Sequence, residues 1–299
     1  MTGADAAQRV GDPALLARAR GLHLAARRLV AGLHAGPHLA VRRGHEAEFL
    51  GYQPYVPPHP LKDVDWRVFA RNDRLVVRER RAERELSCML VFDASADLGS
   101  TPAKWRQALE VTAGLACAVL ANGDPVGLRI GAGGGGGERF VPARRSGGQL
   151  ARILVALASV RPAGRAELSK LFADVGERAQ GRTLVGLVSD FMEDPAAWSG
   201  ALSALTRRNV DLRAVQVYDR DELDLTHDEP ARLVSPETGG TFPVDPGAIR
   251  PAFAEVVTAW RSEVRAAFVA HRGLLVPVAA QDSAVSALAA WLAARPGAP

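Results

Sequence analysis

The sequence predicts an α/β protein: a doubly wound, mostly parallel sheet of six strands, with an irregular N-terminal arm and helix in front of it. From residue 86 onward, short apolar runs alternate with longer helical patterns, as in βαβ units. The runs LSCMLVFD and TLVGLVSD are apolar at nearly every position, which a strand requires when helices cover both faces of its sheet. Residues 1–85 lack this alternation. We therefore expect a helix and arm at 1–85, packed on a main domain at 86–299.

The N-terminal region contains one amphipathic helix followed by an extended arm. Leu15, Leu22 and Leu29 recur near helical spacing within residues 14–34, and Gly36-Pro37 ends the helix. The stretch YQPYVPPHP is extended because each proline fixes φ and disfavours helix at the residue before it, and DRLVVRER alternates like a strand. The arm has too few apolar residues for a core of its own, so we expect it to pack on the main domain.

The elements of the main domain follow in the order of the chain. One short edge strand is expected to be antiparallel and the others parallel. A small hairpin is expected near ARLVSPETGGTFPV. The strands are predicted near residues 87–92, 126–130, 138–142, 184–189, 211–217 and 274–278. The helices are predicted at about 103–121, 148–160, 167–179, 195–208, 247–271 and 283–294.

The charge of the chain is mildly positive and unevenly distributed. The net charge is +4; residues 1–90 hold 15 Lys+Arg against 10 Asp+Glu, a balance of +5, and residues 91–299 hold 22 against 23, a balance of −1. An excess of this size is typical of a solvated face rather than of a nucleic-acid-binding surface. We therefore expect no nucleic-acid partner.

Cysteine usage and hydropathy indicate a cytoplasmic protein. Cys88 and Cys117 stand in apolar runs without metal-ligand spacing, which is typical of small buried core residues in a reducing compartment. The start MTGADAAQRVGDP does not resemble a secretory signal, and no apolar run approaches the ~18 residues that a membrane span needs. No membrane span is expected in this chain, although a protein that binds it could itself be membrane-bound.

Oxygen-bearing side chains follow two of the predicted buried strands. The first strand ends in VFDASAD, with Asp93, Ser95 and Asp97, and a later central strand ends in VSDF, with Asp190. The carboxyl ends of parallel strands meet at one edge of a sheet, where ligands bind. Carboxylate and hydroxyl oxygens suit Mg²⁺. The alternative is that Asp93 and Asp190 cap the helices that follow them.

A third predicted strand adds acidic residues at the same edge. It ends in VYDRDELD, which offers Asp219, Asp221 and Glu222. Negative charges this close together repel one another, which raises their pKa values unless a cation or an arginine intervenes. The three strand ends together concentrate carboxylates at the end of the sheet where ligands bind.

Two motifs carry a family resemblance. The D-x-S-x-[DS] end of the first strand, with the later Asp, resembles the metal-ion-dependent adhesion site of von Willebrand factor A domains. The stretch FLGYQPYVPPHPLKDVDWRVFARNDRLVVRERRAERELSCMLVFDAS resembles the signature of the bacterial family called domain of unknown function 58. The stretches VSDF, VYDRDEL and PETGG match later features in the same order. The resemblance covers about residues 40–290.

The resemblance implies a fold like that of von Willebrand factor A domains and a protein-binding rather than catalytic role. It further implies a partner: a MoxR-type AAA+ ATPase, or a client protein that this ATPase remodels in a chaperone-like or maturation process. In metal-dependent versions, a carboxylate of the partner completes the coordination shell of the ion.

The sequence departs from the family pattern at the implied metal site. Asp97 replaces a second serine and adds negative charge, whereas Ala166 replaces the loop threonine and removes an oxygen ligand. Arg165 beside it could oppose a cation or replace its charge. We expect weak Mg²⁺ binding at Asp93, Ser95, Asp97 and Asp190. The alternative is a metal-free scaffold in which Arg165 replaces the ion and binding uses the N-terminal arm.

A dense polar and aromatic cluster lies in the arm. Asp65, Trp66, Arg67 and Arg71 stand close together in the sequence. One interpretation is an ion-pair and stacking network that pins the arm onto the main domain, in which case Trp66→Ala costs about 3 kcal/mol if the indole is buried. The other is a partner-binding surface, where Trp and Arg are favoured anchors.

Catalysis and nucleotide binding find little support. Ser95 has no identifiable histidine base, and VSDF is no nucleophile elbow, so triad hydrolysis is not expected. A metal-dependent hydrolase, the remaining alternative, would need more ligands than these. The run GAGGGGGER lacks the Lys-Ser/Thr of a phosphate loop and is expected to be a hairpin tip. We therefore predict a binding protein and not an enzyme.

Overall fold

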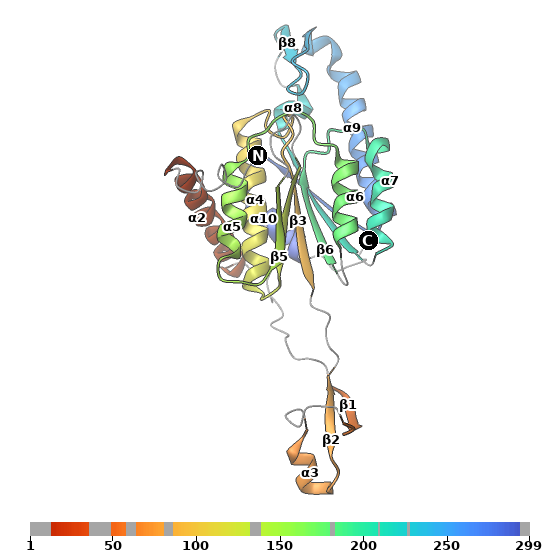
Figure 1. The fold of residues 1–299 in the computed structure, drawn as a ribbon. Helices are drawn as coiled ribbons and strands as arrows, with labels where there is room; N and C mark the ends of the chain where they lie inside the picture. Colours follow the sequence, from red (N-terminus) through yellow and green to blue (C-terminus); the bar gives the residue numbers. More distant parts are fainter. Residues whose placement is uncertain are drawn as a thin grey trace. The chain divides into compact units, whose positions relative to one another are not determined.

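The protein divides into two compact units, which are described separately. One comprises residues 1–40 and 86–299, and the other comprises residues 41–85. The computed structural model describes residues 13–35, 49–57, 64–80, 86–131, 139–179, 183–208, 210–225 and 228–293 (Figure 1). Most of the glycine run expected to form a hairpin tip, residues 132–138, lies outside these ranges.

A six-stranded sheet forms the centre of the larger unit, with the strand order β10-β7-β6-β3-β4-β5. β5 pairs antiparallel with β4 at one edge, and the other neighbouring pairs are parallel. The predicted fold class and the single antiparallel edge strand are therefore confirmed. The strands are β3 (Ser87–Asp93), β4 (Val126–Gly131), β5 (Arg139–Arg144), β6 (Thr183–Ser189), β7 (Val210–Tyr218) and β10 (Leu274–Ala279).

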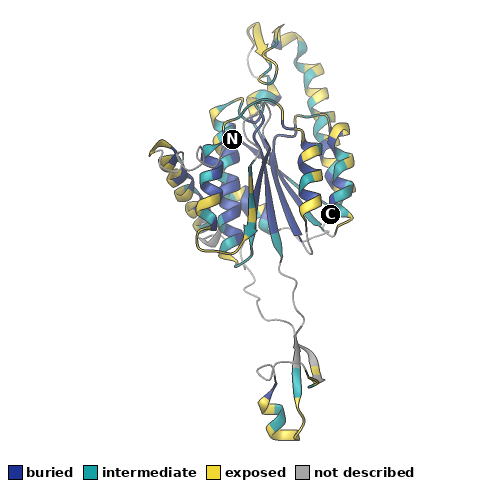
Figure 2. Cartoon of the chain, in the orientation of Figure 1, coloured by how far each residue is buried: buried dark blue, intermediate teal, exposed yellow. Residues whose placement is uncertain are grey.

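Helices cover both faces of this sheet, which explains the almost continuous apolar strands (Figure 2). Side chains alternate along a strand, so Leu90 and Phe92 of β3 enter one core and Met89 and Val91 enter the other. The first core is covered by α4 (Pro102–Ala121), α5 (Gln149–Ser159) and α10 (Ala284–Ala293). The second is covered by α6 (Leu168–Arg178), α7 (Pro195–Thr206) and α9 (Pro246–Ala270).

The N-terminal helix α2 (Pro13–Ala35) belongs to the sheet unit. Its buried residues Leu15, Leu22 and Leu29 join the first core, and the helix packs on α4, α5 and α10. Gly114 of α4 lets the helices approach closely, because a Cβ there would lie 3.0 Å from Leu29 Cδ1 and 2.7 Å from Leu288 Cδ2. The heptad-spaced leucines therefore mark a buried helix face.

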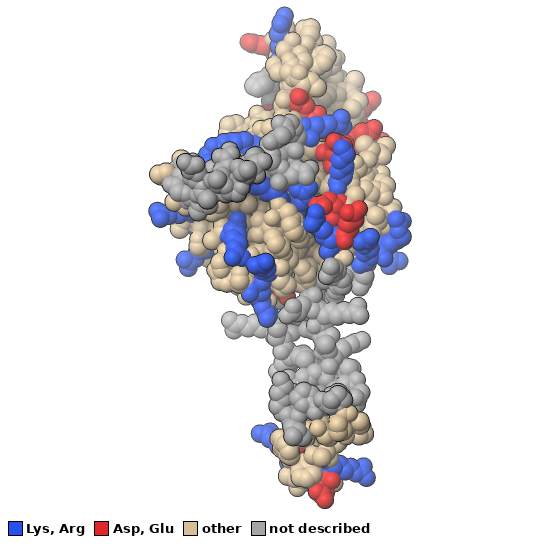
Figure 3. Space-filling view, in the orientation of Figure 1, with Lys and Arg blue, Asp and Glu red and all other residues tan. Residues whose placement is uncertain are grey.

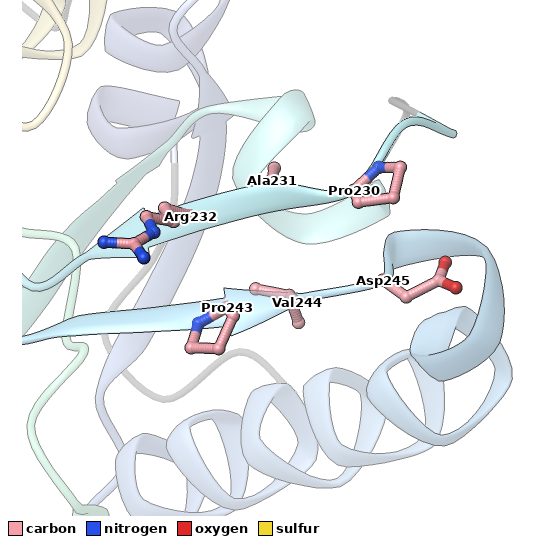
Figure 4. Close-up of a pocket in the computed structure, with 6 residues that line it drawn as sticks. All are labelled: Pro230, Ala231, Arg232, Pro243, Val244 and Asp245. Carbon is pink, nitrogen blue, oxygen red and sulfur yellow. The ribbon is translucent and has the colours of Figure 1, made fainter.

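Two small elements at the carboxyl ends of the strands complete this unit. α8 (Arg220–Asp224) follows β7 directly. The predicted hairpin is confirmed as β8 (Ala231–Val234) and β9 (Thr241–Val244), which leads into α9. Figure 4 shows the shallow hollow between the base of the hairpin and the start of α9. It is lined by Pro230, Ala231, Arg232, Pro243, Val244 and Asp245.

The smaller unit consists of β1 (Phe49–Pro54) and β2 (Val76–Arg80), paired antiparallel, and the helix α3 (Trp66–Asn72). The strand expected in DRLVVRER is confirmed, but α3 was not predicted. Asp65 caps this helix by accepting from Arg67 N at 3.0 Å, and Asp73 ends it with a positive φ of 51°. At seven residues, the helix is too short to show apolar periodicity. The expected packing of the arm on the main domain stays a prediction.

We expect Trp198→Ala to destabilise the sheet unit strongly. Trp198 is fully buried, contacts Phe172, Phe191 and Phe268 in the second core, and donates from Nε1 to Glu193 O at 3.1 Å. Removing the indole leaves a cavity that costs about 3–5 kcal/mol of unfolding free energy. Urea unfolding followed by circular dichroism measures this loss. Trp66→Ala is the matched control and should leave the transition of the sheet unit unchanged.

Candidate functional site

Asp93 is fixed at the carboxyl end of β3 by two hydrogen bonds. The side chain is buried; Oδ1 accepts from Ser95 N at 2.8 Å and Oδ2 accepts from Ser189 Oγ at 2.6 Å. Burial, together with the nearby Asp190 carboxylate, raises the pKa of Asp93 to about 7. Both oxygens of this carboxyl group thus already have protein donors.

Asp190 reaches the same place from the neighbouring strand. β3 and β6 pair in parallel register, so Asp190, which follows β6, lies beside Asp93, as predicted. Asp190 is buried and accepts from Met192 N through Oδ1 at 3.2 Å. The alternative that Asp93 and Asp190 cap helices is wrong, because Thr101 caps α4 and Asp194 caps α7.

A buried lysine, which no sequence pattern indicated, lies against these carboxylates. Lys104 has an exposed fraction of 1%, and its Nζ lies 2.9 Å from Asp190 Oδ2 and 2.9 Å from Glu222 Oε2. It also donates to the backbone oxygen of Asp97 at 2.9 Å. Burial lowers the pKa of Lys104, but Asp190 and Glu222 more than offset this, so the pKa stays above its usual value and the amine stays charged.

The start of α4 brings Lys104 to this position. Thr101 accepts from Lys104 N at 3.2 Å and donates to Asp219 Oδ2 at 3.1 Å, which ties the helix start to the end of β7. Asp219 in turn caps α8 through Asp221 N, which places Glu222 opposite the lysine. A cation in the first turn opposes the helix dipole, so Lys104 depends on its carboxylate partners.

Asp97 contacts the hairpin. Its carboxyl group is half-buried and shares a hydrogen bond with Glu237, which lies on the turn between β8 and β9. Burial, followed by the charge of Asp190, raises the pKa of Asp97; burial, followed by the charge of Asp97, raises the pKa of Glu237. The hairpin turn therefore lies at the site, although the sequence pattern did not place it there.

The remaining predicted residues lie close by but face other groups. Ser95 is buried, and its Oγ accepts from Leu98 N at 3.3 Å. Ala166 is buried and offers a methyl group, on a loop bonded to the Asp93 loop through Ala96 N and Gly164 O at 2.8 Å. Arg165 is 54% exposed, and its Nη2 lies 3.6 Å from Glu193 Oε1. Arg165 therefore pairs with Glu193, and the cation that pairs with Asp190 is Lys104.

With this geometry established, comparison with known proteins places the chain in a family. The family described as Protein of unknown function DUF58 matches residues 51–263. The chain belongs to this family. Two similar proteins are Uncharacterized protein Rv1480 of Mycobacterium tuberculosis and Uncharacterized protein Mb1516 of Mycobacterium bovis. Each is 31% identical over 263 residues, which cover 85% of this chain and 81% of the relative.

Two solved structures to which this DUF58 chain is similar have low sequence identity to it. BatB from Bacteroides thetaiotaomicron is 12% identical with a TM-score of 0.44, and the match covers 69% of this chain and 97% of BatB. The SpRpn10 VWA domain is 11% identical with a TM-score of 0.37, and the match covers 68% of this chain and 93% of that domain. Among the described helices, none is long and apolar enough to cross a membrane.

The described residues of this DUF58 chain do not fit a magnesium ion. Within the described ranges, no group of three or more His, Cys, Asp or Glu side chains is placed to hold a metal. The ammonium group of Lys104 lies at Asp190, and Ala166 offers no oxygen. The weak Mg²⁺ binding expected from the sequence stays a prediction that a titration decides.

The arm residues form a separate exposed group. Trp66 is 55% exposed, Arg67 and Arg71 are exposed, and Trp66 makes an edge contact with Phe69 at a centroid distance of 6.0 Å. The carboxyl group of Asp65 faces inward, where it caps α3 and accepts from Tyr52 OH at 3.4 Å. Within the smaller unit, the indole of Trp66 is therefore not buried.

We expect Lys104→Met to lower the free energy of unfolding by about 3–5 kcal/mol, because it leaves the buried Asp190 and the partly exposed Glu222 without their cation. Urea unfolding measures the change. Lys170→Met is the control. Its pair with Glu167 is solvent-exposed, with a Lys170 side-chain exposure of 74%, so it should change stability by less than about 0.5 kcal/mol. Equal losses in the two variants would contradict the assigned role of Lys104.

Proposed function

We propose that this DUF58 chain is a protein-binding module that presents the strand-end edge of its sheet, with the adjoining hairpin, to a protein partner. The partner that the family resemblance suggests is a MoxR-type AAA+ ATPase, or a client protein that this ATPase remodels. The proposal includes that the chain acts by binding and not by catalysis, and that it works in the cytoplasm. The observation that carries the proposal is an exposed apolar hairpin joined to a fixed charged edge.

The hairpin supplies the exposed part of this surface. Leu233, Val234 and Phe242 are 44%, 59% and 61% exposed, and charged groups of the strand-end edge lie beside them. Figure 3 shows largely uncharged surface over the hairpin at the top of the view. Apolar side chains grouped on a surface and rimmed by polar residues are typical of interaction sites. Contact between Glu237 and Asp97 joins this surface to the edge of the sheet.

The chemistry of the strand-end edge supports binding over hydrolysis. The Ser95 hydroxyl oxygen accepts from a backbone amide and lies in a buried position, which suits a structural role. Lys104 is held by three oxygens and is therefore poorly placed to act as a free base. A phosphatase and esterase panel with added metal would overturn this part of the proposal if it showed turnover that Asp190→Asn abolishes.

A second candidate surface is the arm. Trp66 is exposed beside Arg67 and Arg71, and tryptophan and arginine are the residue types that most often anchor protein interfaces. This candidate corresponds to the scaffold in which the arm carries the binding. The two surfaces lie on different units, so substitutions can test each without touching the other.

We expect the full-length protein to co-purify with an AAA+ ATPase from native lysate, and substitutions on the hairpin to weaken the complex. Phe242→Ser combined with Leu233→Ser removes exposed apolar contacts and should raise the Kd by about tenfold or more, which corresponds to about 1.4 kcal/mol. Both side chains are exposed, so the fold should survive. Affinity for the purified ATPase is measured by biolayer interferometry.

The matched comparison is Trp66→Ala combined with Arg67→Ala and Arg71→Ala, which should leave the Kd within about twofold. If the arm variant loses binding while the hairpin variant keeps it, the second surface is the correct one. If neither variant changes the Kd, the proposed surface is wrong.

We also expect the isolated protein not to bind ATP, because its glycine run lacks the lysine that a phosphate loop places against the phosphates. Calorimetric titration with ATP and Mg²⁺ should give no saturable heat. Micromolar ATP binding by the isolated chain would count against the division of labour in which the partner is the ATPase.

A further inference from the structure

The oxygens expected to bind a divalent ion in this DUF58 chain already have partners within the protein. Asp93 accepts from Ser95 N and Ser189 Oγ, and Asp97 shares a hydrogen bond with Glu237. Ser95 Oγ accepts from a backbone amide, and Asp190 pairs through Oδ2 with Lys104. The expected ligand set is therefore occupied by groups of the chain itself.

We propose that the Lys104 ammonium group is a built-in cation that replaces a divalent ion at this strand-end edge. An ammonium group has three protons to donate. Lys104 Nζ has three oxygen partners, each at 2.9 Å: Asp190 Oδ2, Glu222 Oε2 and Asp97 O. These oxygens come from the segments that follow β6, β7 and β3, so one cation joins three strand ends.

The surroundings of Lys104 suit a permanent structural charge. Its exposed fraction is 1%, and a carboxylate oxygen of Asp190 and one of Glu222 each lie 2.9 Å from its Nζ. A compact ammonium group acts as a point charge that can meet three oxygens at once. The chain contains only three lysines among 37 basic residues, so a lysine at this position is notable against its general use of arginine.

The same geometry excludes a divalent ion while Lys104 is in place. Mg²⁺ binds carboxylate oxygens at about 2.1 Å, so an ion on Asp190 would lie within a few ångströms of the ammonium group. Two like charges this close in a buried position repel strongly. Ala166 offers a methyl group where a hydroxyl would be needed to add a ligand.

This inference deepens the proposed function, on which its consequence for binding rests. A partner that uses this edge would find it assembled without metal, so the complex would form equally well in a chelator. The inference about the cation itself needs no partner, and it is tested on the isolated protein. A titration result that contradicts the inference about Lys104 would therefore not contradict the proposed binding role. Absence of partner binding would likewise not contradict the inference about Lys104.

The test is a Mn²⁺ titration of the full-length protein, followed by electron paramagnetic resonance of the free ion. Wild type should bind no Mn²⁺ at millimolar concentrations. Lys104→Met should gain Mn²⁺ affinity by about tenfold or more, because it frees the oxygens of Asp190, Glu222 and Asp97. Lys104→Arg keeps the charge and is the matched control, with no gain expected. Circular dichroism confirms that each variant is folded.

Two results would overturn the proposal. One is saturable Mn²⁺ or Mg²⁺ binding by wild type that Asp190→Asn abolishes, since the ion then coexists with the lysine. The other is a folded Lys104→Met variant that binds no Mn²⁺, since the lysine then does not occupy a site that a divalent ion could use. If Lys104→Met does not fold, the Tm of wild type decides. An unchanged Tm in chelator and in millimolar Mg²⁺ supports the proposal, and a saturable rise with Mg²⁺ overturns it.

Discussion

The charged interaction of Lys104 with Asp190 and Glu222 is the constraint on which the strand-end edge depends. Parallel strands end side by side, so any acidic residues that follow them are brought together whether or not this is favourable. Burying these charges costs more than their attraction returns unless every polar atom finds a partner. The lysine offsets this cost by donating hydrogen bonds to Glu222 Oε2 and Asp97 O and by an ion pair at 2.9 Å with Asp190 Oδ2. One cation thereby connects α4, α8 and the Asp97 loop.

Much of the fold could be predicted because the sheet is covered on both faces. Runs such as LSCMLVFD have no polar position to assign to solvent, so they indicate central strands without ambiguity, and the helices between them impose parallel pairing. The α3 helix could not be found in this way. It depends on the Asp65 cap and ends after two turns, so its existence is decided by single side chains rather than by a periodic pattern.

The acidic residues of the site could be predicted from the sequence, but its buried lysine could not. Asp93 ends β3 and Asp190 directly follows β6, so the parallel pairing of these two strands accounts for their convergence. The sequence led us to expect a weakly bound Mg²⁺ ion, or Arg165 in its place, and did not indicate Lys104. Arg165 is adjacent to Ala166 in sequence, yet its side chain turns toward Glu193 and solvent. Lys104 lies seven residues beyond Asp97, and only the direction of α4 brings it back.

Separation along the sequence is therefore a poor guide to which side chains meet at this edge. The hairpin shows this over a longer separation than Lys104 does. Glu237 is 140 positions from Asp97, yet the two carboxyl groups meet because the turn between β8 and β9 lies over the strand ends. This contact differs in kind from the one made by Lys104. The lysine is buried and meets three oxygens, so its removal costs stability, whereas Glu237 and Asp97 are partly exposed. Burial raises the pKa of both outer carboxyl groups, whereas the charge of Lys104 lowers the pKa of Asp97 and the charge of Arg165 lowers that of Glu237. The edge thus combines a buried cation that connects the strand ends with an outer pair of carboxyl groups that stays partly open to solvent.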